Sequence, residues 1–336
     1  MLTLSAWPAL WVLVFMALFF NFLNGFHDAS NIVATVISSR AMSPRMALTW
    51  TAIFEFLGPY ALGVAVARTI GADIVGGENI TVVVLYAALF SAIVWNLVTW
   101  YFGIPSSSSH ALIGGLVGAV AMASGPEVIK LEGIEKVLIA LFTSPVIGFV
   151  IGYTLLRVLT ALLWWATPKI NHWFRLSQII TSAALALSHG ANDGQKSMGI
   201  IVLGLVTLGF LPEFSMPNWV IIAASITMAL GAYTGGWRLI HTLGAKFYRI
   251  RPIHGFSVQF TSASVVIGAA LLGGPVSTTQ VVSAAIVGVG TAERASKVRW
   301  KVAQDIAIAW LLTIPATALL AAGAYWVLSQ WVQVVV

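Results

Sequence analysis

Residues 186–199, ALSHGANDGQKSMG, bring several chemically active side chains together inside an otherwise apolar stretch. The side chains lie within about two helical turns of one another. The glycines among them, Gly190 and Gly194, are expected to loosen the backbone. A charged group deep in a bilayer costs at least a few kcal/mol, so the cluster indicates a functional site. The polar members are His189, Asn192, Asp193, Gln195 and Lys196.

Asp193 has a counterpart in Asp28, because NGFHDASN in the first half of the chain aligns with HGANDGQK in the second. An unpaired carboxylate in apolar surroundings either takes up a proton or finds a cation. Both outcomes suit a cotransporter, in which a proton or a cation travels with the substrate. The alternative is a structural ion pair between Asp193 and Lys196 at i,i+3 spacing. That pair leaves Asp28 unexplained, because its i+3 neighbour is Asn31.

The neighbours of the two carboxylates differ in a way that bears on the coupling ion. Asp28 and Asn31 offer oxygen ligands that suit a hard cation such as sodium or a divalent ion. Beside Asp193, the ammonium group of Lys196 repels any cation. We therefore hypothesise that Lys196 stands where a symmetric site would hold a metal ion, and that coupling is to protons rather than to sodium.

Two short segments, PSSSSH at 105–110 and PVSTTQ at 275–280, have the composition of anion-binding helix starts. Proline favours the first turn of a helix. The hydroxyls and free backbone N–H groups that follow then lie at the positive end of the helix dipole. Serine and threonine also cap many membrane helices, but two aligned copies favour binding. The predicted substrate ligands are Ser107, Ser108, Ser109, Ser277, Thr278, Thr279, Asn31, Asn192 and Lys196.

Further polar residues interrupt the apolar runs and are candidates for proton or cation coupling. Glu55 lies in the middle of IFEFLG, and a buried carboxylate is costly. A membrane histidine often does no more than hydrogen-bond a neighbouring helix, which is the alternative for His27 and His110. Asn96 and Gln259 are weaker candidates. The predicted coupling residues are Asp28, Asp193, His27, Glu55, His110 and Gln280.

The composition predicts an all-α polytopic membrane protein. Hydrophobic residues make up 59% of the 336 residues and charged residues 8%, whereas soluble domains carry about 25% charged residues. Apolar runs are long enough to cross about 30 Å of hydrocarbon, and they lack the alternation of a β-barrel. The first run has no basic start and no cleavage site, so we read it as a retained helix. The chain has no cysteine, which excludes disulfides and thiolate metal sites.

The two pairs of aligned motifs divide the chain into repeats. We expect a first transmembrane repeat at 1–166, a short cytoplasmic connector at 167–176 and a second repeat at 177–336. Each repeat is expected to contain a broken helix and a re-entrant hairpin, at 85–123 and 255–288. Secondary transporters are often built from such repeats in inverted orientation, with the substrate at their interface.

The basic residues predict the orientation. If the N-terminus lies outside, most of the 17 basic residues fall in loops on the inner side, the two repeats run in opposite directions, and both termini are extracytoplasmic. The net charge of +6 is then a topology signal, and we expect lipid but no nucleic acid as a partner. A homodimer is compatible with the sequence. The inner basic residues are Arg40, Arg45, Arg157, Lys169, Arg175, Arg238, Lys246, Arg249, Arg251, Arg294, Lys297, Arg299 and Lys301.

The motifs of common enzymes are missing from the chain. It has no Walker loop, nucleophile elbow or zinc-ligand spacing, so we expect neither an enzyme nor direct coupling to ATP. We also expect no tightly bound cofactor. An anion channel is disfavoured because it needs no coupling carboxylates, and a membrane scaffold is disfavoured because it needs no aligned buried charges.

With these motifs, the chain resembles the inorganic phosphate transporter (PiT) family, and in particular its bacterial low-affinity branch. The family carries a GAND-type signature in each half and a PxSTTH-type segment in each hairpin. The resemblance implies a multi-pass symporter in the plasma (inner) membrane of a bacterium, which takes up phosphate with protons or sodium by alternating access. It also implies that signature residues ligate cations in sodium-coupled forms. A divalent cation that travels with the phosphate is a further implication.

Departures from the family pattern sharpen the prediction. His27 and Lys196 replace asparagines of the signatures, and Gln280 replaces a histidine, which argues against sodium coupling. Sulfate is the alternative substrate, because it is also a tetrahedral oxyanion. Hydrogen phosphate can donate a hydrogen bond to a carboxylate such as Glu55 and sulfate cannot, so we favour proton-coupled phosphate uptake.

Overall fold

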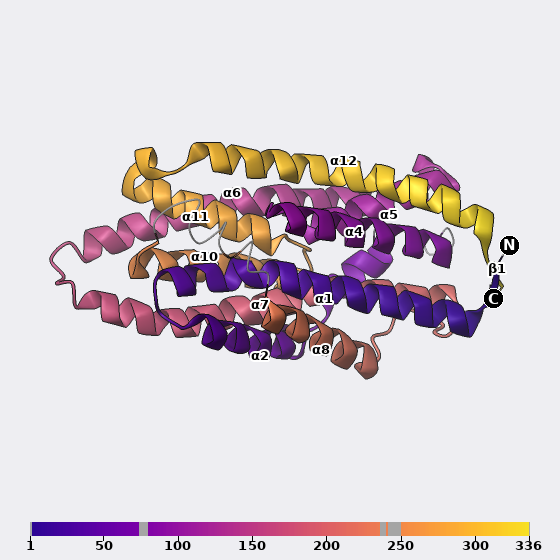
Figure 1. The fold of residues 1–336 in the computed structure, drawn as a ribbon, viewed down its shortest axis with the longest axis horizontal. Helices are drawn as coiled ribbons and strands as arrows, with labels where there is room; N and C mark the ends of the chain where they lie inside the picture. Colours follow the sequence, from indigo (N-terminus) through magenta and orange to yellow (C-terminus); the bar gives the residue numbers. More distant parts are fainter. Residues whose placement is uncertain (1, 74–79, 236–239, 241–249, 336) are drawn as a thin grey trace.

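The computed structural model describes residues 2–73, 80–235, 240 and 250–335, and most of them lie in helices along one long axis (Figure 1). Five of the described helices are long and apolar enough to cross a membrane. This arrangement confirms the prediction of an all-α, multi-pass membrane protein. The helices of the first half are α1 (Ala6–Ser38), α2 (Pro44–Leu62), α3 (Ala65–Arg68), α4 (Val82–Phe102), α5 (Ser108–Ser124) and α6 (Leu131–Leu162).

The second half follows a short connection after α6. Its helices are α7 (Ile170–Thr207), α8 (Asn218–Thr234), α10 (Pro252–Leu271), α11 (Thr278–Arg294) and α12 (Trp300–Trp331). Helix α1 begins at the end of the molecule where the chain termini lie, and α7 begins at the opposite end, so these two central helices run in opposite directions (Figure 1).

Both signature segments lie within continuous helices, which corrects the expectation that Gly190 and Gly194 loosen the backbone. Gly190 instead allows a close approach of two helices, because a Cβ atom there would collide with the backbone carbonyl of Glu55 on α2. Gly25 has the same role against the backbone of Met228 on α8. The helical interruption in the first half occurs elsewhere. At Gly63, where φ is 77°, α2 bends by 76° into the short α3.

The two predicted hairpins are present as α4–α5 and α10–α11. Gly103 and Gly273, with φ of 66° and 68°, turn the chain after the first helix of each hairpin, a conformation that glycine adopts without strain. Ser107 and Ser277 then cap the second helices, accepting hydrogen bonds from the backbone N–H groups of His110 and Gln280. Each second helix thus begins directly after its capping serine, and Pro105 and Pro275 precede the first turn rather than lying in it as predicted.

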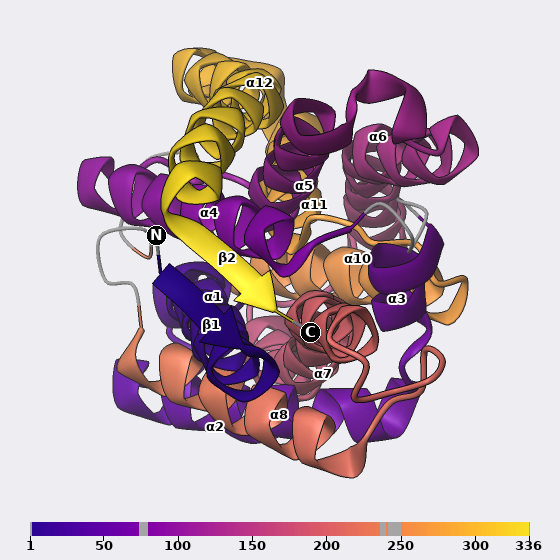
Figure 2. The same cartoon turned by 90° about the vertical axis from the view of Figure 1, so that its right-hand side faces the viewer.

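Helices pack in matching pairs across the two halves. Helix α1 packs against α8 and α2 against α7, while α5 packs against α12 and α11 against α6. The termini meet at one end, where β1 (Leu2–Ser5) pairs in parallel with β2 (Val332–Val335) (Figure 2). Arg238, Lys246 and Arg249, which the orientation argument uses, lie outside the described residues.

Candidate functional site

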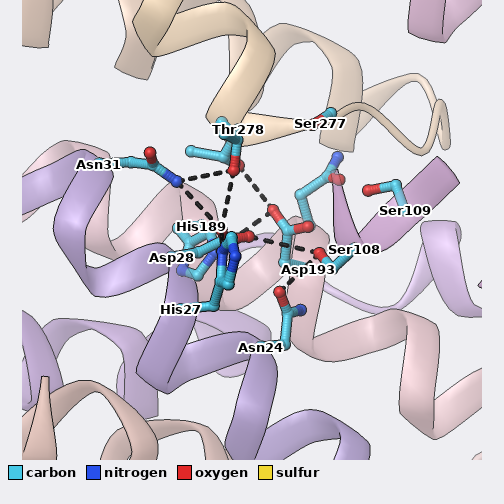
Figure 3. A network of polar contacts seen from close by, with 12 residues as sticks. Asn24, His27, Asp28, Asn31, Ser108, Ser109, His189, Asp193, Ser277 and Thr278 are labelled. Atoms are coloured by element: carbon cyan, nitrogen blue, oxygen red, sulfur yellow. Dashed lines mark hydrogen bonds and ion pairs between the residues drawn. The ribbon is translucent and has the colours of Figure 1, made fainter. Parts of the chain in front are cut away.

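The two signature aspartates lie close to each other between α1, α7 and the tips of both hairpins (Figure 3). Asp28 is buried and accepts hydrogen bonds from the side chains around it. Thr279 Oγ1 donates to its Oδ1 over 2.8 Å, and Asn31 Nδ2 donates to the same oxygen over 3.1 Å. Ser108 Oγ donates to its Oδ2 over 3.3 Å. Hydroxyls from both hairpins therefore reach one carboxylate.

Asp193, also buried, has the charged neighbour that the sequence predicted. Its Oδ1 forms an ion pair with the ammonium group of Lys196, and its Oδ2 accepts a hydrogen bond from Thr278 over 2.6 Å. Lys196 also donates to Ser109 Oγ and, over 2.8 Å, to the carbonyl of Val276. The ammonium group thus joins the second signature to both hairpin tips.

His189 is the main residue of the site that the sequence analysis left without a role. Its Nδ1 lies 2.8 Å from Glu55 Oε1, while its Nε2 lies 3.7 Å from Asp28 Oδ2 and 3.6 Å from Asp193 Oδ2. Its ring is completely buried and lies between three carboxylates. The i,i+4 spacing from Asp193 was a local signal. Its contacts with Glu55 and Asp28, which are far away in the sequence, could not be predicted from residue spacing.

Asn24 is a second residue that the sequence analysis did not assign to the site. Its Oδ1 accepts a hydrogen bond from Ser108 over 2.7 Å. Asn24 aligns with His189 at the start of the first signature, and this position could have identified it as a site residue. The two aligned positions therefore carry different chemistry, an amide in one half and an imidazole in the other.

The remaining predicted substrate ligands lie at the edge of this cluster. Asn192 holds the second hairpin loop, since its Nδ2 donates to the Gly274 carbonyl over 3.1 Å and its Oδ1 accepts from Val276 N over 3.2 Å. Ser107 and Ser277 use their hydroxyl oxygens as helix caps. Among the described contacts, neither of these two serines reaches Asp28 or Asp193.

The predicted coupling residues fall into two groups. His27 Nδ1 lies 3.1 Å from Asp28 Oδ1, and its Nε2 has no hydrogen-bond partner among the described residues. His110 and Gln280, which align with each other, meet directly across the two hairpins, with 3.2 Å between His110 Nδ1 and Gln280 Nε2. Both are buried. His27 thus joins the aspartate cluster, whereas His110 and Gln280 form a separate pair.

A metal ion would find its donors in a set that differs from the predicted one. Ligand atoms of Asp28, His189 and Asp193 all lie within 4.8 Å of one another. Asn31, which the sequence suggested as the partner of Asp28, presents its amide nitrogen rather than its oxygen to that carboxylate. Two carboxylates and an imidazole form a donor set that suits a small cation.

The charge of the cluster limits what it can bind. Within the described residues, it contains the buried carboxylates of Asp28, Glu55 and Asp193. Its positive groups are the ammonium of Lys196 and, when they are protonated, the imidazoles of His27 and His189. An anion entering this water-poor place adds further negative charge, which is stable only if protons or cations accompany it. The hydroxyls of both hairpin tips supply the hydrogen-bonding groups that an oxyanion needs. The arrangement is therefore suited to bind an oxyanion together with positive charge.

Comparison with known proteins agrees with this chemistry. A family described as "Phosphate transporter family" matches residues 24–321. A Rhizobium meliloti (strain 1021) protein named "Probable low-affinity inorganic phosphate transporter" is 45% identical over 322 residues, which cover 95% of this chain and 96% of the relative. A Bacillus subtilis (strain 168) protein of the same name is 43% identical over 324 residues, covering 95% and 97%.

A solved structure is similar along nearly the whole chain. It is described as "The sodium-dependent phosphate transporter" and superposes with a TM-score of 0.90 at 25% identity. The similarity covers 96% of this chain and 100% of that one.

Proposed function

This chain belongs to the phosphate transporter family, and we propose that it imports inorganic phosphate as a proton-coupled secondary symporter that works by alternating access. The observation that carries the proposal is the charge of the buried cluster. Three carboxylates face one permanent ammonium group and two imidazoles that can take up protons, so an anion is expected to enter together with positive charge. The family is one of transporters and not of enzymes.

Lys196 favours protons over sodium as the coupling ion. Its ammonium group lies against Asp193 and reaches both hairpin tips, so it occupies the place that a cation would take in the second half. Glu55 and His189 offer a site for a mobile proton, because they form a buried pair next to both aspartates. Asp28, His189 and Asp193 offer donor atoms for a metal ion that would travel with the phosphate.

Sodium coupling is the second candidate, and a specific observation favours it. The similar solved structure is described as sodium-dependent. The Asp28 side of the cluster has no ammonium group beside it among the described contacts, so a sodium ion would meet less repulsion there than at Asp193. Sulfate is the alternative substrate, but the carboxylates that accept hydrogen bonds favour an anion that can donate one.

We also propose that the halves at 1–166 and 177–336 are inverted repeats joined by a cytoplasmic connector at 167–176. The opposite directions of α1 and α7 support this arrangement (Figure 1), as do the matching helix pairs across the halves. The basic residues of the loops support a connector inside the cell and both termini outside it. Exposed apolar side chains such as Val146 on α6 and Leu319 on α12 are suited to contact with lipid.

Uptake into proteoliposomes tests the proposal. An inward proton gradient in sodium-free buffer should drive accumulation of labelled phosphate, and excess sulfate should not compete. In parallel, a sodium gradient at constant pH should increase the accumulation of phosphate only slightly. If accumulation of phosphate requires sodium, the coupling ion is sodium and not the proton. Equal competition by sulfate would overturn the substrate assignment.

A further inference from the structure

A row of buried polar side chains leads away from the aspartate cluster between α1, α7 and α10. Its central member is Gln259 on α10. Gln259 Nε2 donates to Thr35 Oγ1 on α1 over 3.0 Å, and its Oε1 accepts from Thr181 Oγ1 on α7 over 2.7 Å. Thr35 lies one helical turn beyond Asn31, which is part of the cluster. The amide of Gln259 therefore bridges all three helices directly beside the site.

The row continues one turn further from the cluster. Ser39 Oγ, at the C-terminal cap of α1, donates to Gln178 Oε1 on α7 over 2.7 Å. Gln178 Nε2 in turn donates to the carbonyls of Phe174 and Pro252 over 3.2 and 3.1 Å. On the side of the cluster, Ser262 lies on the same face of α10 as Gln259. Its hydroxyl is buried and has no hydrogen-bond partner among the described residues.

A basic cleft lies at the far end of this row. Its volume is about 750 Å³, and Phe174, Arg157, Arg251 and His254 are among its lining residues. Phe174 links the cleft to the row through its carbonyl, which accepts the hydrogen bond from Gln178. The start of α7 lines this cleft, and α7 begins at the end of the molecule opposite the termini (Figure 1). Glu293 also lines the cleft and pairs with Arg251, so the lining keeps a net positive charge through Arg157, which makes it suitable for receiving an anion.

The opposite side of the cluster has no comparable row in the described part of the chain. The alignment of the halves that matches Asp28 with Asp193 also matches Gln178 with Leu13, and the alignment of the hairpins matches Gln259 with Leu89. Leu13 and Leu89 are completely buried in the largest apolar cluster of the protein. The other counterparts of the row are Ile200 for Thr35, Met16 for Thr181, Gly204 for Ser39 and Ala92 for Ser262.

Packing alone does not account for this difference between the two sides. The leucines on one side show that apolar residues fill the equivalent space, and buried polar groups are costly unless they are satisfied. Ser262 is one of several buried polar side chains without a partner among the described residues, and its place beside the row suits a hydroxyl that water or a ligand satisfies. Hydrogen bonds between side chains can be exchanged for bonds to water or to an anion at little net change in free energy.

We propose that this row is the path by which phosphate passes between the aspartate cluster and the basic cleft, and that the contacts of Gln259 and Gln178 are its closed gate. The inference rests on the proposed function, because it assumes that the anion binds at the cluster. The gate on the opposite side is apolar and opens by separating Leu13 and Leu89 from their neighbours. The two gates of the transporter thus differ in chemistry, although the surrounding helices match.

Cysteine labelling tests the path, and the natural chain has no cysteine to remove. We would compare Ser262→Cys with the matched control Ala92→Cys in proteoliposomes during phosphate exchange. A charged, membrane-impermeant thiol reagent is added only on the side of the membrane that the basic cleft faces. It reaches Ser262→Cys along the polar row, whereas the closed apolar gate keeps it from Ala92→Cys, so Ser262→Cys should react about tenfold faster or more. Saturating inorganic phosphate should slow its reaction. Equal rates, or no reaction of Ser262→Cys in a protein that still exchanges phosphate, would overturn the path.

A gate variant gives a second test. Gln259→Leu copies the residue of the apolar side and should slow phosphate exchange by about tenfold or more, because an amide that bonds the passing anion is lost. Phosphate affinity in detergent should stay within about twofold of the parent value, since the cluster itself is unchanged. Gln259→Asn, which keeps the amide, should retain more of the exchange rate. A loss of affinity that matches the loss of rate would contradict the gate.

The labelling result does not depend on phosphate uptake by the unmodified protein. If that protein fails to accumulate phosphate but Ser262→Cys still reacts faster than Ala92→Cys, the proposed function fails and the polar path remains. If it accumulates phosphate while both cysteines react alike, the path fails and the proposed function remains.

Discussion

His189 Nδ1 lies 2.8 Å from Glu55 Oε1, so two ionisable side chains from α7 and α2 meet in a part of the protein that excludes water. The other imidazole nitrogen faces both signature aspartates at 3.6–3.7 Å. A proton that moves between these groups changes the charge beside the proposed substrate position. Under the proposed proton coupling, this pair links the coupling proton to the anion.

Glu55→Gln is expected to uncouple transport. The amide can still hydrogen-bond His189 but cannot carry a proton, so proton-driven phosphate accumulation should fall by about tenfold or more, the usual scale for a lost proton-transfer group. Phosphate exchange without a gradient should persist. The control is Glu213→Gln, because Glu213 is exposed and far from the cluster in the sequence. Full accumulation by Glu55→Gln would exclude a role for this carboxylate in coupling.

The two aspartates should both be required for accumulation, but with different effects on stability. Asp28→Asn and Asp193→Asn should each abolish uptake. Asp193→Asn also leaves the buried ammonium group of Lys196 uncompensated, which should destabilise the protein by about 3 kcal/mol or more. Adding Lys196→Met should restore the thermal stability in detergent but not the uptake. Equal destabilisation by the two single variants would show that the ion pair contributes little.

Lys196→Asn recreates in the second half the Asp–Asn spacing of the first. Removing the fixed positive charge opens a place for a cation beside Asp193. We expect phosphate uptake by this variant to become stimulated by sodium, which is measured by titrating sodium at constant pH. The parent protein should show no such stimulation. Sodium-independent uptake by the variant would mean that Lys196 does not determine the coupling ion.

The hairpin hydroxyls should contribute to affinity one hydrogen bond at a time. Ser108→Ala or Thr278→Ala should weaken phosphate binding by about 1 kcal/mol, or roughly fivefold in the dissociation constant. Equilibrium binding of labelled phosphate measures the change. Thr143→Ala, on an exposed part of α6, serves as the control and should leave affinity unchanged. Unchanged affinity in both hairpin variants would place the anion elsewhere.

The close contact at Gly190 makes a prediction about folding. A Cβ atom there would collide with the Glu55 backbone, so Gly190→Ala should destabilise the protein by about 1–3 kcal/mol, the usual range for overpacking. Gly323→Ala on α12 is the control, since its Cβ atom would meet no other atom within 4 Å. It should stabilise the helix by up to about 1 kcal/mol. Thermal unfolding in detergent measures the stability of both variants. Similar shifts in their melting temperatures would contradict a packing role for Gly190.

The sequence by itself determined the features that depend on short spacing. Apolar runs and hairpin motifs predicted the helical membrane fold, and the i,i+3 spacing offered the observed pair of Asp193 with Lys196 as an alternative. The capping serines follow from the same kind of local geometry, because a residue three positions along a helix start is always within reach.

Only the tertiary structure decided which distant side chains meet. The contacts of His189 with Glu55, of Asn24 with Ser108 and of Gln259 with Thr35 join helices far apart in the chain. Such contacts depend on how each helix is rotated and on how closely it packs, which local spacing does not fix. For the same reason, Gly190 suggested a flexible backbone in the sequence, whereas the packed structure shows a continuous helix held close to its neighbour.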